Sequence, residues 1–180
     1  MTALKQIDPI RSVSFSGHRP DRLPGQGEPD APEAQKLIKV LRGQIEDAIL
    51  RGKDTFINGL MAGWDVLAAE QVIALKERCP HIRLVTVAPF SSGLFSRERC
   101  WTPDWVERAK GACRQSDIGM SLSECYRAGI YYERDRVMVD HSGELLCYWD
   151  GALSGTQYTV QYASGRGLIV CNLFQRFQEQ

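Results

Sequence analysis

The stretch T-F-I-N-G-L-M-A-G-W-D-V-L-A-A-E at residues 55–70 decides the fold class of this 180-residue chain. Thr55 to Ile57 is short and apolar, which predicts a buried strand. Asn58 to Gly63 then predicts a glycine-containing turn, and Asp65 to Arg78 has helical spacing with small residues that allow close approach to a sheet. The strand expected at Ile82 to Val87, which ends at Pro89-Phe90, completes a βαβ unit.

The same alternation continues on both sides of this unit. A strand at Val13 to Ser16, a loop at His18 to Pro32 and a helix at Glu33 to Arg51 precede it. The elements expected after it alternate helix and strand: Pro103–Gln115, Ile118–Leu122, Ile130–Asp140, Leu145–Trp149, Thr156–Ala163 and Leu168–Cys171. No element is assigned between Ser91 and Trp101. This order predicts a three-layer, Rossmann-like α/β fold with a mostly parallel sheet covered by helices on both faces.

Length and composition indicate one domain. With 43% hydrophobic residues the chain can fill a single core, which we place at residues 12–172, between an N-terminal tail at 1–11 and a C-terminal tail at 173–180. The start of the chain lacks the apolar run of a secretion signal and no later stretch reaches membrane-spanning length, so a cytoplasmic protein without a membrane partner is expected. Lys and Arg total 22, as do Asp and Glu, so nucleic acid is not an expected partner.

Metal and cysteine chemistry are not expected. The six cysteines are scattered without a C-x-x-C pair, and the three histidines lie far apart in sequence. Cys147 and Cys171 lie in apolar strand-like runs, where a free thiol behaves as a small buried hydrophobe. We therefore predict no metal site and no cofactor.

Two segments follow the first strands and carry candidate binding residues. In Ser16-Gly17-His18-Arg19-Pro20, glycine permits a sharp exit from the strand and two donor side chains follow, although a surface turn would look the same. The glycines of Asn58 to Asp65 could let backbone amides close on a phosphate at a helix start. Their spacing matches neither the dinucleotide motif nor a P-loop, and Asp65 could simply cap the helix.

Two later segments repeat this chemistry. In the charged run Glu133 to Arg136, only one arginine should face the site, because Arg136 lies about 200 degrees around the helix from Arg134. Asp150 to Thr156 is again strand, glycine turn and helix start, offering amides and a hydroxyl to a phosphate or ribose, or merely a cap.

Because ligands bind beyond the carboxyl ends of parallel strands, these segments predict one anion-binding cradle, formed by the amides of two helix starts beside Arg134. The ligand-binding residues that we expect are Ser16, Gly17, His18, Arg19, Asn58, Gly59, Met61, Gly63, Asp65, Pro89, Phe90, Arg134, Asp135, Met138, Asp150, Gly151, Gly155 and Thr156.

Together the segments at 16–20, 56–70, 88–90, 134–140 and 150–163 resemble the SLOG superfamily, in particular its YpsA-like branch. The resemblance extends from about Val13 to Cys171. It implies a Rossmann-like fold related to the Lonely Guy phosphoribohydrolases and to the DNA processing protein A family. It also implies nucleotides, nucleotide sugars or NAD-derived ligands such as ADP-ribose, with some members acting as sensors in stress or antiphage systems. By the same resemblance Gly17, His18 and Arg19 would line the first turn, Gly59, Gly63 and Asp65 the second, Arg134 and Asp135 the helix edge, and Gly155 with Thr156 the phosphate turn.

The chain departs from these relatives at three positions. Thr159 stands where the Lonely Guy motif P-G-G-x-G-T-x-x-E places its catalytic glutamate, so that carboxylate is missing. Ser154 stands where the YpsA-like branch often has glycine, and Asp135 replaces a frequent asparagine.

Three functions are therefore carried forward. The first is binding or sensing of a nucleotide or nucleotide-derived ligand, such as ADP-ribose, an NAD derivative or a nucleoside monophosphate. The second is N-glycoside hydrolysis of a nucleoside 5′-monophosphate, with Glu70 or Asp65 as the catalytic carboxylate and Arg134 holding the phosphate. The third is a single-stranded DNA-binding adaptor, against which the balanced charge counts. A homo-oligomer, dimeric or larger, is left open, and four aromatic residues could be core, lid or dimer contacts: Trp64, Trp101, Trp105 and Tyr131.

Overall fold

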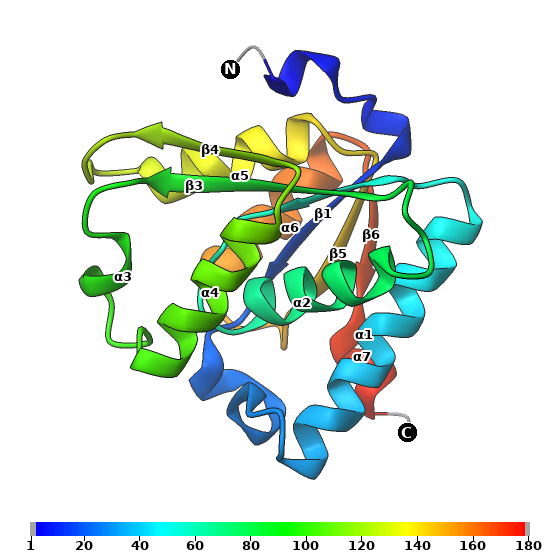
Figure 1. Ribbon diagram of the computed structural model, residues 1–180, viewed down its shortest axis with the longest axis horizontal. Coiled ribbons are helices and arrows are strands. Elements are labelled where there is room, and N and C mark those ends of the chain that lie inside the picture. Colours follow the sequence, from blue (N-terminus) through cyan, green and yellow to red (C-terminus); the bar gives the residue numbers. More distant parts are fainter. Residues whose placement is uncertain (1–2, 179–180) are drawn as a thin grey trace.

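A computed structural model describes residues 3–178 and shows one six-stranded sheet in the order β4-β3-β2-β1-β5-β6. All five strand pairings are parallel. The strands are β1 (Ser12–Gly17), β2 (Thr55–Asn58), β3 (Arg83–Phe90), β4 (Ile118–Ser123), β5 (Glu144–Tyr148) and β6 (Ile169–Asn172). This architecture confirms the predicted three-layer α/β fold (Figure 1).

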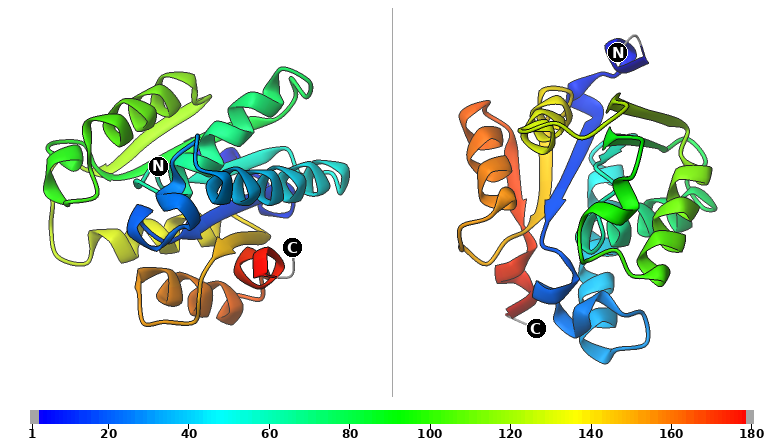
Figure 2. Two further views of the ribbon diagram at one scale, coloured as in Figure 1. Left: turned by 90° about the horizontal axis from the view of Figure 1, so that it is seen from below. Right: turned by 90° about the vertical axis from the view of Figure 1, so that its left-hand side faces the viewer.

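Helices cover both faces of the sheet. Three lie on one face: α1 (Pro32–Leu50), α2 (Trp64–Lys76) and α4 (Pro103–Gln115). The other face carries α5 (Ile130–Asp140) and α6 (Gly155–Gly165), which pack against each other (Figure 2). Among residues 3–178, no helix combines the length and the apolarity that crossing a bilayer needs.

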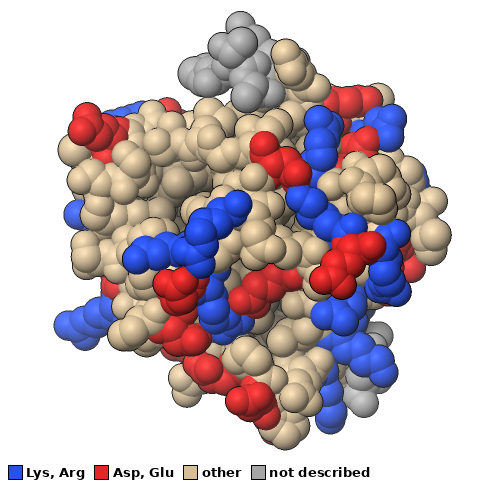
Figure 3. Space-filling view, viewed as in Figure 1, with Lys and Arg blue, Asp and Glu red and all other residues tan. Residues whose placement is uncertain are grey.

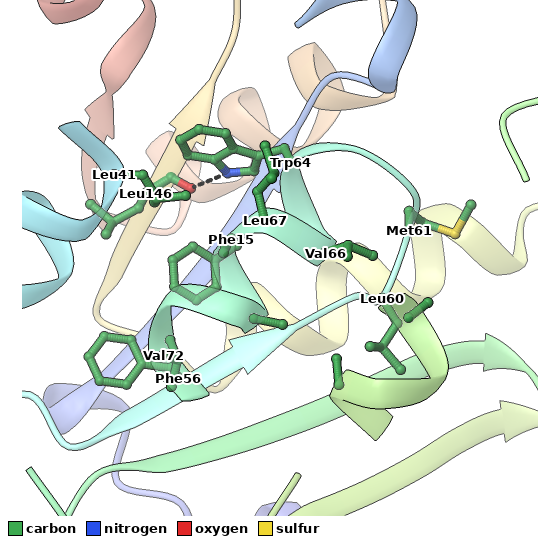
Figure 4. Packing of buried hydrophobic residues seen from close by; sticks show 14 of the residues in the cluster. Phe15, Leu41, Phe56, Leu60, Met61, Trp64, Val66, Leu67, Val72 and Leu146 are labelled. Carbon is green, nitrogen blue, oxygen red and sulfur yellow. Dashed lines mark hydrogen bonds between the residues drawn. The ribbon is translucent and has the colours of Figure 1, made fainter. Parts of the chain in front are cut away.

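The main core lies between the sheet and the α1, α2 and α4 layer. Phe15 of β1 and Leu146 of β5 point into it, with Trp64 and Phe56 nearby (Figure 4). Val13 of β1 belongs to the same cluster. Successive strand residues point to opposite faces, so Leu145 and Cys147 pack with α5 and α6 instead. Burial on both faces explains the continuous apolar run from Leu145 to Tyr148 in β5.

Small serines alternate with the apolar residues of β1. Ser12, Ser14 and Ser16 are buried between Val13 and Phe15. Because their side chains point away from the main core, they face the layer of α5 and α6. The small hydroxymethyl groups leave room for α5 and α6 above β1, where the helices present polar residues.

Short elements that the sequence did not predict complete the chain. These are α3 (Leu94–Arg97), α7 (Leu173–Gln178) and the 3-10 helices Ala3–Gln6, Pro9–Arg11, Pro20–Arg22 and Pro24–Gly27. The last two fall within the expected loop at 18–32. In the segment expected to be a C-terminal tail, Leu173 is fully buried and α7 packs against α1 and β5.

A buried acid lies at the amino end of β5. The carboxylate of Glu144 is almost fully buried, and Arg51 Nη2 donates hydrogen bonds of 2.7 and 2.9 Å to its two oxygens. The next cation, Lys53 Nζ, is 4.0 Å away. Arg51→Met is therefore expected to lower the free energy of unfolding by about 2 kcal/mol, measured by urea denaturation, because it leaves a buried charge poorly compensated.

The matched control is Arg78→Met, which removes the exposed ion pair with Glu46 and should cost no more than about 0.5 kcal/mol. Equal losses in the two variants would show that the burial of Glu144 does not matter.

Candidate functional site

A cavity of about 410 Å³ opens at the carboxyl end of the sheet, between β1, α5 and the start of α6. The position is the one at which open parallel sheets bind ligands. Its lining residues are Phe15, Ser16, Gly17, His18, Arg19, Asp21, Arg22, Asp65, Tyr126, Gly129, Tyr131, Tyr132, Arg134, Asp135, Ser154, Gly155 and Thr156.

A buried arginine stands between two buried carboxylates in this cavity. Arg134 is only 4% exposed, and its Nη1 donates to Asp65 Oδ2 at 3.3 Å. Its Nε lies 3.0 Å from Asp135 Oδ1, at ion-pair distance, but this buried N–H makes no aligned hydrogen bond with any described residue. Arg134 is therefore a buried cation between two carboxylates at the wall of the cavity. On the same helix Arg136 points outward and donates to Tyr158, as helical spacing predicts.

Asp65 reaches the cavity from the start of α2. Its Oδ2 also accepts a hydrogen bond of 3.3 Å from the amide of Met61. Burial raises the pKa of Asp65 above its usual range, although the charges of Arg134 and Arg19 favour the ionised form. The side chain does not cap α2, whose N-cap is Gly63 without a side-chain hydrogen bond.

The turn between β2 and α2 does not form an open amide cradle. Asn58 Oδ1 accepts from the Leu60 amide at 2.8 Å, and the Met61 amide is bonded to Asp65. These amides are therefore already used, and Gly59 and Met61 lie outside the lining of the cavity. The expected convergence of amides from two helix starts on one anion is wrong in this respect: at the start of α2 the side chain of Asp65 lines the cavity, while the Leu60 and Met61 amides are already bonded.

The glycines of this turn serve close packing instead. A Cβ on Gly59 would lie 1.3 Å from Nη1 of Arg134. Gly63 has a φ of +96°, and a Cβ there would lie 2.6 Å from the carbonyl oxygen of His18. Gly59 thus makes space for the buried guanidinium of Arg134. Gly63 allows the segment that follows β2 to pack directly against the backbone that follows β1.

The start of α6 offers amides to the cavity. Ser154 caps this helix by accepting a hydrogen bond of 3.2 Å from the Gln157 amide. The first amides of a helix lack intrahelical partners, so those of Gly155 and Thr156 are available beside the cavity. The helix dipole adds partial positive charge at the same place.

Polar contacts join the loops after β1 and β5 at the edge of the cavity. Arg22 Nη2 donates to both oxygens of Asp150 at 2.7 and 2.6 Å, and His18 Nε2 lies 3.0 Å from Oδ1 of Asp150. Desolvation and the charge of Arg22 lower the pKa of His18, so its ring is neutral at pH 7. Burial would raise the pKa of Asp150, but the Ala152 amide, Arg22 and His18 lower it to about 2.

The structure brings together half of the residues expected at the site. Those that line the cavity are Ser16, Gly17, His18, Arg19, Asp65, Arg134, Asp135, Gly155 and Thr156. The others lie outside its lining: Asn58, Gly59, Met61, Gly63, Pro89, Phe90, Met138, Asp150 and Gly151. Two of these residues contact lining residues: Gly59 makes space for Arg134, and Asp150 accepts hydrogen bonds from Arg22.

Glu70, the other carboxylate considered for catalysis, is not at the cavity. Arg108 holds it through two hydrogen bonds of 2.7 and 2.8 Å between α2 and α4. Asp65 alone of the two lines the cavity, and it is hydrogen-bonded to Arg134.

Sequence reasoning missed an aromatic wall of the cavity. Tyr126, Tyr131 and Tyr132 come from the start of α5 and the irregular segment before it. A cluster of three tyrosines within seven residues was the available signal. Phe15, Asp21, Arg22, Gly129 and Ser154 were also not expected at the site.

Comparison with known proteins places the chain among bacterial relatives. The family described as the YspA SLOG family, YpsA, matches residues 13–166, which confirms the resemblance to the YpsA-like branch. YoqJ, an uncharacterized SPbeta prophage-derived protein of Bacillus subtilis (strain 168), is 28% identical over 73% of this chain and 82% of that protein. A UPF0398 protein of Bacillus pumilus (strain SAFR-032) is 22% identical over 86% of this chain and 82% of that protein.

Two solved structures share the fold. DNA processing protein A from Streptococcus pneumoniae superposes with a TM-score of 0.60 at 19% identity, over 93% of this chain and 50% of that one. The protein of the same name from Helicobacter pylori, whose structure concerns its single-stranded DNA binding mode, gives a TM-score of 0.57 at 17% identity, over 94% of this chain and 67% of that one. The present chain thus spans half of the Streptococcus protein.

These neighbours correct the expectation that nucleic acid is not a partner. That expectation rested on equal numbers of basic and acidic residues, which Figure 3 shows interspersed on the face of α2 and α4. A protein with the same fold has a described single-stranded DNA binding mode. Overall charge balance is therefore no argument against nucleic acid, because binding depends on local groups.

Proposed function

We propose that this chain, which belongs to the YspA SLOG family, binds a nucleotide or nucleotide-derived ligand in the carboxyl-end cavity. The observation that carries the proposal is the buried Arg134 at the wall of the cavity, beside the free amides of α6.

The groups around Arg134 match the parts of a nucleotide. A phosphate suits the α6 amides and the guanidinium, since both donate hydrogen bonds to anions. The carboxylates of Asp65 and Asp135 accept hydrogen bonds and suit sugar hydroxyls rather than phosphate oxygens. The tyrosine rings that also line the cavity provide faces on which a base can stack.

Thermal unfolding with AMP, ADP-ribose, NAD and cyclic ADP-ribose tests this proposal. A ligand present at about 100 times its Kd should stabilise the chain by about 2.7 kcal/mol, which raises Tm by roughly 5–10 °C at this size. Arg134→Lys keeps a positive charge between the carboxylates but removes the planar guanidinium, and it should remove most of the shift.

Arg78→Met is a control outside the site and should keep the full shift. The proposal fails when no compound shifts Tm, or when Arg134→Lys retains the same shift as wild type.

Single-stranded DNA is a second candidate, favoured by the fold that this chain shares with DNA processing protein A. The phosphate that the cavity binds would then belong to a strand rather than to a free nucleotide. Fluorescence anisotropy with a labelled oligodeoxythymidine shows whether the bound phosphate can belong to a DNA strand. Binding that Arg134→Lys weakens and that AMP competes away supports the strand, whereas no binding at low salt excludes it.

A further inference from the structure

A second cavity of about 640 Å³ adjoins the first. The segment from Phe90 to Glu98 forms most of its wall. Tyr126 and Tyr131 line both cavities, so the two spaces meet at these rings. A ligand anchored at Arg134 can therefore extend past the tyrosines into a second compartment.

Three aromatic rings form one side of this compartment. Phe90 meets Tyr126 and Tyr131 edge-on, with ring centroids 5.8 and 6.0 Å apart. Tyr126 packs against Phe90 and Tyr131 although the residue is 41% exposed. A rigid ring with an accessible face is a ready stacking platform.

A flat cation already occupies the face of Tyr126. The guanidinium carbon of Arg97 lies 3.2 Å from the centroid of the ring. Arg97 is exposed on the short helix α3, so it can leave the ring at little cost. A planar heteroaromatic ring fits the same face, and a guanidinium can then stack on the ring's other side.

Polar groups at the back of the compartment can contact the edge of such a ring. The hydroxyl of Tyr131 is buried next to Glu98, and burial together with this carboxylate raises the pKa of Tyr131. Glu98 also lines the compartment and accepts a hydrogen bond of 3.2 Å from Arg19, which lines the first cavity. A hydroxyl and a carboxylate are suited to ring nitrogens and exocyclic amino groups.

We propose that the base of a nucleotide binds in the second compartment against Tyr126, between this ring and Arg97, while the phosphate binds near Arg134. The inference rests on the proposed function and adds an orientation to it. The ligand is then a nucleoside phosphate. Its base and its sugar phosphate bind in different compartments, and each contributes to the affinity.

Calorimetric titration with AMP and with ribose 5-phosphate tests this orientation. Wild type should bind AMP more tightly than ribose 5-phosphate, which lacks the base. Tyr126→Ala should weaken AMP binding at least fivefold and leave ribose 5-phosphate binding unchanged, because a stacked base is lost. Tyr126→Phe keeps the ring and should bind AMP as wild type does.

The matched control is Tyr162→Ala, which removes a tyrosine on α6 that lines neither cavity and should change neither affinity. The orientation is overturned when Tyr126→Ala binds AMP as tightly as wild type, or when it loses affinity for both compounds equally. When wild type binds neither compound, the proposed function itself fails, and the orientation fails with it.

Discussion

Gly59→Ala is expected to lower the free energy of unfolding by about 3 kcal/mol, measured by urea denaturation. The new Cβ would lie 1.3 Å from Nη1 of Arg134 and 2.8 Å from Oδ2 of Asp65. Both neighbours are buried, so the clash must displace a guanidinium that is hydrogen-bonded to a buried carboxylate. The variant should also lose ligand binding, because Arg134 can no longer occupy its place beside the cavity.

Gly43→Ala is the matched control. Gly43 lies within α1, and a Cβ there meets nothing within 4 Å. The same chemical change should then stabilise the chain by about 0.5–1 kcal/mol, since alanine favours the helix. A second test combines Gly59→Ala with Arg134→Ala. The losses of unfolding free energy in the two single variants should not add in the double variant, because alanine at position 134 removes the side chain with which the new Cβ clashes. Additive costs, or equal small effects at both glycines, would contradict this account of Gly59.

The layered fold could be predicted from the sequence because its signals are local. The strands contain short apolar runs, such as Leu145 to Tyr148 in β5, and two helices begin at residues typical of helix starts: α4 starts at Pro103 and α5 follows Gly129. Both helices have the predicted bounds. The helices α3 and α7 have four and six residues, too few for a helical period to be visible.

The site could be predicted only in part, because the same residue types serve two purposes. Asn58, Gly59 and Asp65 are typical of an anion-binding turn, but here Asn58 and Asp65 bond the amides of the turn themselves. Which acceptor an amide finds depends on tertiary geometry and not on spacing. Arg134, by contrast, was predictable, because its helical position separates it from Arg136.

The tyrosine wall could not be placed from the sequence for a different reason. The segment between β4 and α5 has no hydrophobic period, and it joins α5 through Gly129, whose φ is +79°. Long-range packing of Tyr126 against Phe90 then fixes the ring. Such contacts join residues from separate elements and leave no local pattern.

Arg134→Met is expected to lower the free energy of unfolding at pH 7 by about 4 kcal/mol, because two buried carboxylates, Asp65 and Asp135, lose the cation between them. Methionine fills much of the space of the arginine stem, so the loss reports charge rather than a cavity. Urea denaturation at several pH values measures it.

The pH dependence of this loss follows from Asp65. Burial raises the pKa of Asp65 in the folded protein, and Arg134 is the largest influence opposing that rise. A carboxyl with a raised folded pKa contributes stability below its unfolded pKa, about 3.9, and loses it as pH rises through the folded value. Removing Arg134 raises the folded pKa further, so the difference from wild type should be largest near pH 7 and shrink towards pH 4.

A double-mutant cycle separates the charge effect from lost packing. Asn at position 65 can still accept the Met61 amide but carries no charge. Adding Asp65→Asn to Arg134→Met should therefore restore 1–2 kcal/mol, roughly the coupling seen between neighbouring groups, and flatten the pH dependence. The account fails if the loss of unfolding free energy in the double variant equals the sum of the losses in the two single variants, and if these losses do not depend on pH. Arg134 would then stabilise the fold through packing and not through its charge.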